Sequence, residues 1–260
     1  MNILQELAEA TEVRYQQREK DIPLENIKEQ ARVFSSPLEA FAFRKALQKK
    51  GLSLICEVKK ASPSKGAIAE YFPYLEIARE YEEGGADAIS VLTEPSRFLG
   101  CDEHLSTIAT KVSVPVLRKD FTVKPYQLYE AKLLGASAIL LICALLSDWQ
   151  IANYLALCNE LQLDALVEVH DQYEVKRALA LGSSIIGVNN RNLKTFQVDI
   201  ETSIRLRDLV PPSVVFISES GIRNKEDTAI LRQHGVDAVL IGETLMRAKD
   251  KRALIQEFKG

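Results

Sequence analysis

The stretch Leu52-Ser53-Leu54-Ile55-Cys56-Glu57-Val58-Lys59-Lys60-Ala61-Ser62-Pro63-Ser64-Lys65-Gly66 joins an apolar run to alternating charges and a loop of Ser, Pro and Gly. Because alternate residues of a β-strand face the same side, Glu57 and Lys59 should point the same way at the strand's end. An acid and a base in that arrangement are suited to proton transfer. A solvated edge strand ending in a polar turn is the alternative, and the stretch alone favours it. Similar groups at other strand ends change that interpretation.

Eight short apolar runs, of which this is the first, alternate along the chain with amphipathic segments. The strand-like runs are 52–59, 87–92, 114–119, 137–142, 164–169, 184–189, 213–218 and 236–241. Helices are indicated between most of them: one ends at Gly84-Gly85, and two begin at the capping sequences Ser147-Asp148-Trp149-Gln150 and Asp171-Gln172-Tyr173-Glu174. Segment 98–111 should also be a helix, although its signals are weak.

This alternation predicts a parallel sheet, because parallel strands need a crossover connection. Eight such units in about 200 residues fit an α/β fold of the (β/α)8 TIM-barrel type. An open doubly wound sheet is the alternative, but the Gly-rich dinucleotide turn typical of its first strand is absent from the sequence. In a barrel, active sites lie at the carboxyl ends of the strands.

The first 50 residues predict an N-terminal helical extension. Ile3, Leu4, Leu7 and Ala8 fall on one helical face. The capping box Ser36-Pro37-Leu38-Glu39 predicts a helix that runs to Gly51. We therefore expect a single domain over residues 1–260, with the extension over 1–50 and the barrel over 51–260.

Composition excludes several classes of function. The 260 residues are 47% hydrophobic and 27% charged, with a net charge of −3 and no basic stripe, so neither nucleic-acid binding nor a membrane span is expected. The amino terminus does not resemble a signal peptide. The four cysteines are scattered along the sequence, which predicts reduced thiols and a cytoplasmic location. The three histidines are scattered as well, so no metal site is expected.

Ionisable or amide side chains recur at the predicted strand ends, and this repetition indicates a catalytic cup. The residues at these ends are Glu57, Lys59, Glu94, Arg118, Lys119, Asp120, Glu168, His170, Asn189, Asn190, Arg191, Glu219 and Glu243. Each one singly is also compatible with a charged loop residue or a helix cap.

Small residues follow the last two strands, at Ser220-Gly221 and Gly242-Glu243. Exposed backbone N–H groups there, with a short helix beginning near Glu243, would hold a phosphate. Glycines that merely end strands are the alternative. We predict phosphate binding by Gly221, Gly242 and Glu243.

Five motifs together resemble the indole-3-glycerol phosphate synthase family. They are the stretch 57–66, Leu117-Arg118-Lys119-Asp120-Phe121, Leu166-Val167-Glu168-Val169-His170, Asn189-Asn190-Arg191-Asn192-Leu193 and Ser218-Glu219-Ser220-Gly221-Ile222. They occur in the family's order. The resemblance implies a decarboxylating lyase of tryptophan biosynthesis that closes the indole ring of 1-(2-carboxyphenylamino)-1-deoxyribulose 5-phosphate. It implies a phosphorylated small-molecule substrate and no cofactor, and we expect a monofunctional enzyme and a monomer.

The resemblance also implies residue roles. Lys119 would be the general acid and Glu168 the general base, with Lys59, Glu57 and Asn189 in the same catalytic set. The division of the two acid steps between Lys119 and Lys59 stays open. Substrate-binding positions would be Ser62, Pro63, Phe98, Phe121, Leu140, Arg191, Leu193, Glu219 and Ser220. Arg191 could instead pair with Glu168 or Glu219, Leu140 could be core, and His170 is expected to serve the start of the next helix.

The proposed acid, Lys119, and the proposed base, Glu168, both need pKa values shifted from their ordinary ones. A lysine with its ordinary pKa of about 10.4 is a weak acid near neutrality. Burial or Lys59 would lower the pKa of Lys119, whereas Glu57 and Glu168 would raise it, and the sequence leaves the net direction open. Glu168 would need a dry setting that raises its pKa toward that of a working base.

Two other classes of protein remain as alternatives. One is another phosphosugar barrel enzyme, either a Schiff-base aldolase with Lys119 as nucleophile or a phosphoribosyl-anthranilate isomerase. The other is a non-catalytic barrel that binds a phosphosugar.

Overall fold

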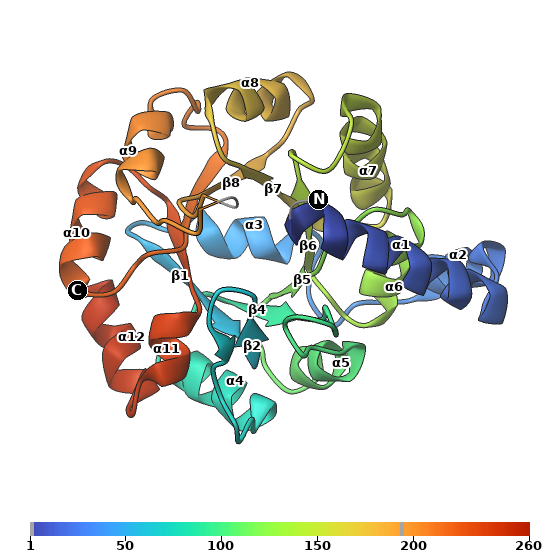
Figure 1. The fold of residues 1–260 in the computed structure, drawn as a ribbon, viewed down its shortest axis with the longest axis horizontal. Helices are drawn as coiled ribbons and strands as arrows, with labels where there is room; N and C mark the ends of the chain where they lie inside the picture. Colours follow the sequence, from blue (N-terminus) through green and yellow to red (C-terminus); the bar gives the residue numbers. More distant parts are fainter. Residues whose placement is uncertain (1–2, 193–194) are drawn as a thin grey trace.

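A closed barrel of eight parallel strands forms the centre of the molecule (Figure 1). The computed structural model describes residues 3–192 and 195–260. The order of hydrogen-bonded neighbours around the barrel is β1-β10-β9-β8-β7-β6-β5-β4. The predicted (β/α)8 barrel and all eight predicted strands are confirmed. The strands are β1 (Ser53–Val58), β4 (Ala88–Leu92), β5 (Val116–Lys119), β6 (Ala138–Ile142), β7 (Asp164–Val169), β8 (Ile185–Asn189), β9 (Val215–Glu219) and β10 (Ala238–Ile241).

Helices follow the strands in sequence and form the outer ring in Figure 1. They are α4 (Tyr74–Glu83), α5 (Asp102–Ala109), α6 (Tyr126–Leu133), α7 (Asp148–Glu160), α8 (Gln172–Ala180), α9 (Glu201–Arg207), α10 (Lys225–Gln233), α11 (Glu243–Arg247) and α12 (Lys251–Lys259). The capping box at Ser147 is formed, and Asp171 caps α8 by accepting from the Glu174 N–H. The weakly marked segment 98–111 contains α5.

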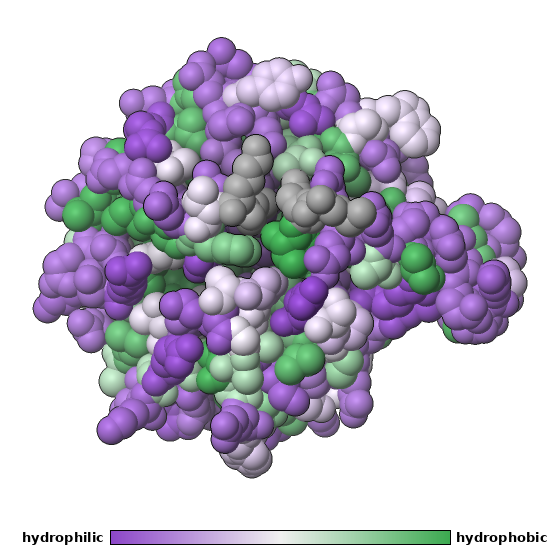
Figure 2. Space-filling view, viewed as in Figure 1, coloured by the Kyte–Doolittle hydropathy of each residue, from purple (hydrophilic) through white to green (hydrophobic). Residues whose placement is uncertain are grey.

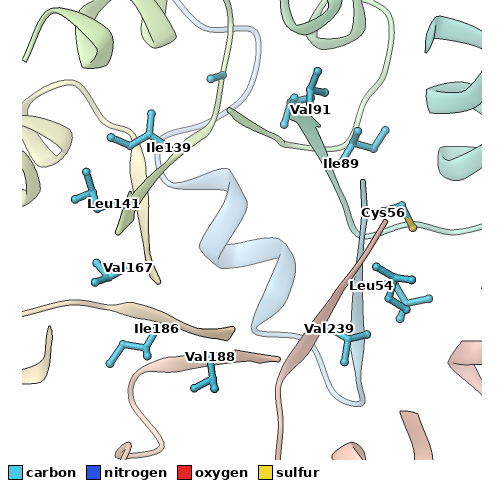
Figure 3. Packing of buried hydrophobic residues seen from close by; sticks show 14 of the residues in the cluster. Leu54, Cys56, Ile89, Val91, Ile139, Leu141, Val167, Ile186, Val188 and Val239 are labelled. Atoms are coloured by element: carbon cyan, nitrogen blue, oxygen red, sulfur yellow. The ribbon is translucent and has the colours of Figure 1, made fainter. Parts of the chain in front are cut away.

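The barrel strands carry apolar side chains on both faces, which explains why each strand appears in the sequence as a short continuous apolar run. The outward-facing residues share one buried cluster with apolar residues of the outer helices. Figure 3 shows the side chains of Leu54, Val91 and Val167 pointing away from the centre of the barrel. A second cluster fills the barrel and includes Ile55, Leu117 and further residues of the same inward alternation. The sheet is thus buried on both sides, as a barrel surrounded by helices requires.

Three helices precede β1: α1 (Ile3–Asp21), α2 (Leu24–Val33) and α3 (Ala42–Leu47). In Figure 1, α3 is seen through the ring of strands, whereas α1 and α2 extend to one side. Phe43 and Leu47 of α3 are fully buried in the cluster that fills the barrel, and Leu4 of α1 belongs to the same cluster. None of the helices in the described part of the chain is long and apolar enough to cross a membrane.

The predicted start of the third helix is wrong. The Ser36 hydroxyl accepts from the Leu38 N–H within a turn, and the helix begins six residues later, at Ala42. It ends at Leu47 and is not capped by Gly51. Tertiary contacts set its position: Phe43 enters the barrel, and the Arg44 N–H donates to Asp164 Oδ2 at 2.8 Å. A local capping signal was therefore overridden by packing against the barrel.

A buried charged cluster attaches α1 to β5. The fully buried Tyr15 accepts a hydrogen bond from Arg118 at 2.8 Å, and Arg118 also contacts Asp102 at 2.7 Å and Glu130 at 2.8 Å. Arg14 adds an ion pair with Asp120 at 2.8 Å. Because Arg118 and Lys119 are consecutive, they point to opposite faces of β5. The extension is therefore fixed to the strand that carries Lys119.

We expect Phe43→Ala to destabilise the protein strongly, because it empties the end of the barrel interior. Large-to-small substitution of a buried phenylalanine costs about 3–5 kcal/mol. Urea unfolding should show this loss, whereas Val33→Ala, at a side chain that is 82% exposed, should change the free energy of unfolding by less than about 0.5 kcal/mol. Similar effects of the two substitutions would contradict the role of α3.

Candidate active site

A cavity of about 650 Å³ opens at the carboxyl ends of the strands. Figure 2 shows this face, with apolar residues near its middle and hydrophilic residues around them. The cavity is lined by all the described residues that were predicted to be catalytic, substrate-binding or phosphate-binding: Glu57, Lys59, Ser62, Pro63, Phe98, Lys119, Phe121, Leu140, Glu168, Asn189, Arg191, Glu219, Ser220, Gly221, Gly242 and Glu243. Four other charged or amide residues at the strand ends, Glu94, Arg118, His170 and Asn190, do not line it. Leu193 lies outside the described residues. Positions distant in sequence are thus brought together at one end of the barrel.

Glu57 and Lys59 face the same side at the end of β1, as the alternation predicted. Lys59 Nζ lies 2.5 Å from Glu57 Oε1, and both side chains are largely buried. Gly242 makes room for this pair, because a Cβ at that position would overlap Glu57 Oε1. The loop that follows contains a short antiparallel hairpin of β2 (Ala61–Ser62) and β3 (Gly66–Ala67), which places Ser62 and Pro63 over the cavity.

Lys119, the last residue of β5, extends its ammonium toward two carboxylates. Lys119 Nζ lies 3.5 Å from Glu168 Oε2 and 3.9 Å from Glu219 Oε2. Burial disfavours the charged amine, but Glu168, Glu219 and Glu57 outweigh burial and raise the pKa of Lys119 above its ordinary value. The direction that the sequence left open is therefore upward, and Lys119 is an ammonium group at neutral pH.

Glu168 on β7 is held in its ionised form. Burial alone would raise its pKa, but Lys119, the contact with His170 and a hydrogen bond donated by Asn189 Nδ2 at 3.3 Å lower the pKa to about 2. The raised pKa that Glu168 would need as a working base is therefore not found. Its positive neighbours dominate over the desolvation that a dry pocket imposes.

His170 contacts Glu168, which the sequence interpretation did not foresee. Its Nε2 lies 3.4 Å from Glu168 Oε1, and its Nδ1 lies 3.1 Å from Glu174 Oε2. Burial disfavours the imidazolium, but the two carboxylates raise the pKa of His170 to about 10. The expected helix-start contact is also present, since the His170 N–H donates to Glu174. The motif Glu168-Val169-His170 carried a signal for this contact in its alternate spacing.

Glu219, the last residue of β9, differs from Glu168 in that its pKa is raised. Burial and repulsion from Glu168 and Glu57 exceed the attraction of Lys119 and raise the pKa of Glu219 to about 8. Its Oε1 has no hydrogen-bond partner among the described residues. Gly187 on β8 leaves space for this carboxyl group, because a Cβ there would overlap Glu219 Oε1. The cavity thus contains an ionised and a protonated carboxyl group side by side.

An apolar wall lies beside the charged groups. The rings of Phe98 and Phe121 have centroids 6.2 Å apart, and Leu140 adds a buried side chain from β6. Leu4 and Leu7 of α1 complete this wall. The sequence showed the apolar face of that helix, but its position against the cavity depends on how α1 docks on the barrel.

The opposite side of the cavity is rich in backbone and cationic groups. Ser220 and Gly221 have positive φ angles of 71° and 89° after β9, and Gly242 precedes α11. The negatively charged carboxylate of Glu243 does not suit anion binding, and it forms ion pairs with Lys65 Nζ at 3.6 Å and Arg247 Nε at 3.2 Å. Any contribution of Glu243 to phosphate binding would come from its backbone N–H.

In the described part of the chain, Arg191 forms no ion pair with Glu168 or Glu219. Its Nη1 donates to the Phe196 carbonyl at 3.2 Å, and its N–H donates to Asn189 Oδ1 at 3.0 Å. It therefore remains at the cavity wall, where a substrate anion could reach it. Within residues 3–192 and 195–260, no group of three or more His, Cys, Asp or Glu side chains could hold a metal ion.

Known proteins are similar to this chain over almost its whole length. The family model described as indole-3-glycerol phosphate synthase matches residues 4–258. An indole-3-glycerol phosphate synthase of Ruminiclostridium cellulolyticum is 53% identical over 260 residues, which cover 99% of each chain. The protein of that name from Lachnoclostridium phytofermentans is 49% identical over 267 residues, covering 99% of this chain and 98% of its own.

More distant solved structures share the fold. A 3-hexulose-6-phosphate synthase from Salmonella typhimurium has a TM-score of 0.66 at 13% identity, covering 80% of this chain and 97% of its own. A thiamine phosphate pyrophosphorylase from Pyrococcus furiosus has a TM-score of 0.61 at 18% identity, covering 80% and 93%. At such identities the similarity shows the barrel architecture alone.

We expect Glu219→Gln to reveal the raised pKa of Glu219 as a pH-dependent gain in stability. The folded state binds the Glu219 proton up to about pH 8, whereas the ordinary value is 4.5, so ionisation costs stability as pH rises between these values. The free energy of unfolding of the variant, relative to the original protein, should increase across this window and level off above it. A difference that stays constant from pH 4 to about 9 would contradict the assignment.

Proposed function

The chain belongs to the indole-3-glycerol phosphate synthase family, and we propose that its charged cup carries out ring closure through Lys119 and Glu168. Enzymes of this family convert 1-(2-carboxyphenylamino)-1-deoxyribulose 5-phosphate into indole-3-glycerol phosphate, carbon dioxide and water in tryptophan biosynthesis. The observation that carries the residue assignment is the 3.5 Å distance between Lys119 Nζ and Glu168 Oε2 at the cavity mouth. Residues 49 positions apart in sequence thereby share one reaction site.

The two sides of the cavity fit the two ends of this substrate. The wall of Phe98, Phe121 and Leu140 would receive the aromatic ring, with Leu4 and Leu7 closing over it. The backbone N–H groups near Gly221 and Gly242, with Lys65 and Arg247 close by, would receive the phosphate. The reacting ketone would then lie between the two ends, beside the ammonium groups.

In this proposal Lys119 assists formation of the carbon–carbon bond. Its ammonium donates to the ketone oxygen and stabilises the negative charge that develops when the ring carbon bearing the carboxylate attacks the carbonyl carbon. The oxygen takes a proton from the Lys119 ammonium and becomes a hydroxyl group, and the amine regains a proton before the next turnover. Cleavage of the bond to the carboxylate then releases carbon dioxide, and its electron pair restores the aromatic ring. The raised pKa of Lys119 keeps the amine protonated before the attack, so that a positive charge faces the oxygen as its negative charge develops.

Loss of water completes the indole. The new hydroxyl leaves with a proton from an ammonium group, and one hydrogen of the neighbouring methylene carbon is removed by a base. Glu168 is ionised and is held by Asn189 and His170, so it can serve as that base. Lys59, paired with Glu57, is the second candidate acid, and Lys119 can fill the same role.

The aldolase alternative fits the site poorly. Schiff-base formation needs a neutral amine, whereas Glu168, Glu219 and Glu57 keep Lys119 charged. The overall activity is tested directly by incubating the protein with synthetic 1-(2-carboxyphenylamino)-1-deoxyribulose 5-phosphate and following indole fluorescence. Turnover without added metal or cofactor is expected, and its absence in the folded protein would overturn the proposal.

We expect Lys119→Ala to lower kcat by about 1,000-fold or more, because the ketone oxygen loses its cationic donor. The phosphate end of the cavity is untouched, so binding of the product indole-3-glycerol phosphate should persist. Calorimetric titration and the fluorescence assay measure the two effects separately. Lys176→Ala, at an exposed position of α8, is the matched control and should keep full activity. Turnover by Lys119→Ala at the original rate would refute the role.

We expect Glu168→Gln to reduce kcat by about 100- to 10,000-fold, because the amide cannot accept the methylene proton. Removing this anion also leaves the ammonium of Lys119 less stabilised. Thermal unfolding measured beside activity separates chemistry from folding, and Glu160→Gln, an exposed position on α7, provides the control. A loss of activity that only parallels a loss of folded protein would count against the assignment.

A further inference from the structure

A second cavity lies at the opposite end of the barrel from the active site. Its volume is about 330 Å³, within the range of small-ligand pockets. It lies among the end of α2, the segment 34–40, the end of α6 and the turns that precede β6 and β7. The lining residues are Arg32, Phe34, Ser35, Ser36, Leu38, Glu39, Ala40, Lys132, Ala136, Ser137, Gln162 and Leu163.

Lys132 is the unusual residue of this cavity. It is only 7% exposed, yet no carboxylate of the described chain forms an ion pair with it. The one acid in the lining, Glu39, is exposed and lies 2.6 Å from Lys45. Lys132 stands in the last turn of α6, whose carbonyl end supplies only a partial negative charge. A buried ammonium without a full counter-charge is costly, and burial accordingly lowers the pKa of Lys132.

The rest of the lining supplies hydrogen-bond donors. Ser35, Ser36 and Ser137 have hydroxyl groups, and Gln162 has an amide. Ser36 Oγ already accepts from the Leu38 N–H, so its own hydrogen is available as a donor. Arg32 adds a second positive charge from the last turn of α2. Several neutral donors around a cationic centre match the acceptor oxygens of an oxyanion, and the two cations disfavour a metal ion.

We propose that this cavity is an anion site in which Lys132 binds a phosphate-sized oxyanion, remote from the catalytic cup. A phosphate has enough acceptor oxygens to engage Lys132, the serine hydroxyls and Arg32 together. Such a ligand contacts both the N-terminal segment and the turns that enter β6 and β7. Its binding therefore fastens the extension to the barrel and stabilises the folded chain. The proposal does not depend on the activity assigned to the cup.

The direct test is NMR of protein labelled with ¹³C and ¹⁵N in lysine, titrated with inorganic phosphate at constant ionic strength maintained with sodium chloride. The Lys132 signal is identified by its loss in Lys132→Arg, which removes the labelled lysine but keeps the positive charge. We expect this signal to shift and saturate with phosphate but not with chloride. The signals of Lys59 and Lys119 report separately on phosphate in the catalytic cavity. A Lys132 signal that does not move, or that moves equally with chloride, would overturn the site.

Thermal unfolding gives a second readout. Phosphate should raise the Tm of the original protein more than that of Lys132→Met, while Lys132→Arg should retain the larger increase. Phosphate in the active site affects all three proteins equally, so the difference belongs to the second cavity. If Lys132→Met fails to fold, Ser137→Ala should raise the phosphate concentration at half-saturation of the Lys132 signal. Equal Tm increases, or an unchanged half-saturation in Ser137→Ala, would contradict the proposal.

Discussion

The active site depends on the contact of the buried Lys119 ammonium with the carboxylate of Glu168 and the carboxyl group of Glu219. Three carboxyl groups gather at this end of the barrel, and they cannot all be ionised at close range without positive neighbours. Glu168 has the nearer contact with Lys119 and the added support of His170, so it keeps its charge. Glu219 is left with an oxygen that has no partner in the described chain, and it retains its proton to about pH 8. One set of charges therefore yields a cationic donor, an ionised base and a neutral acid.

The barrel and its extension hold these groups in place. Parallel strands deliver their carboxyl ends to one rim, and Gly187 and Gly242 leave the space that the carboxylates of Glu219 and Glu57 occupy. On β5, alternation turns Lys119 into the cavity and Arg118 outward, where Arg118 meets Tyr15 of α1. The helix that covers the apolar wall is thus anchored through the residue adjacent to the proposed acid. Displacement of α1 would disturb both the ring-binding wall and the strand that carries Lys119.

The strands and the composition of the cup were predictable from sequence because both follow from local alternation. Apolar runs with charged ends located the eight barrel strands, and the known direction of barrel strands predicted that Glu57, Lys119 and Glu168 lie at one mouth. Properties that depend on three-dimensional packing were not predictable. The Ser36 capping signal was locally valid, but packing of Phe43 under the barrel displaced the helix start. The low pKa of Glu168 required knowledge of its distances to Lys119 and His170, and the covering of the cavity by Leu4 required the docking of α1.

The most direct test of the central claim is the pKa of Lys119 itself, measured by pH titration of its ε-carbon NMR signal in the ligand-free protein. The carboxylates that surround the amine predict a pKa above the ordinary value of 10.5, so that the signal stays in its ammonium position through the neutral range and beyond. A Lys119 that loses its proton near neutral pH would show that burial, and not the carboxylates of Glu168 and Glu219, controls the site. That result would contradict the account of the cup.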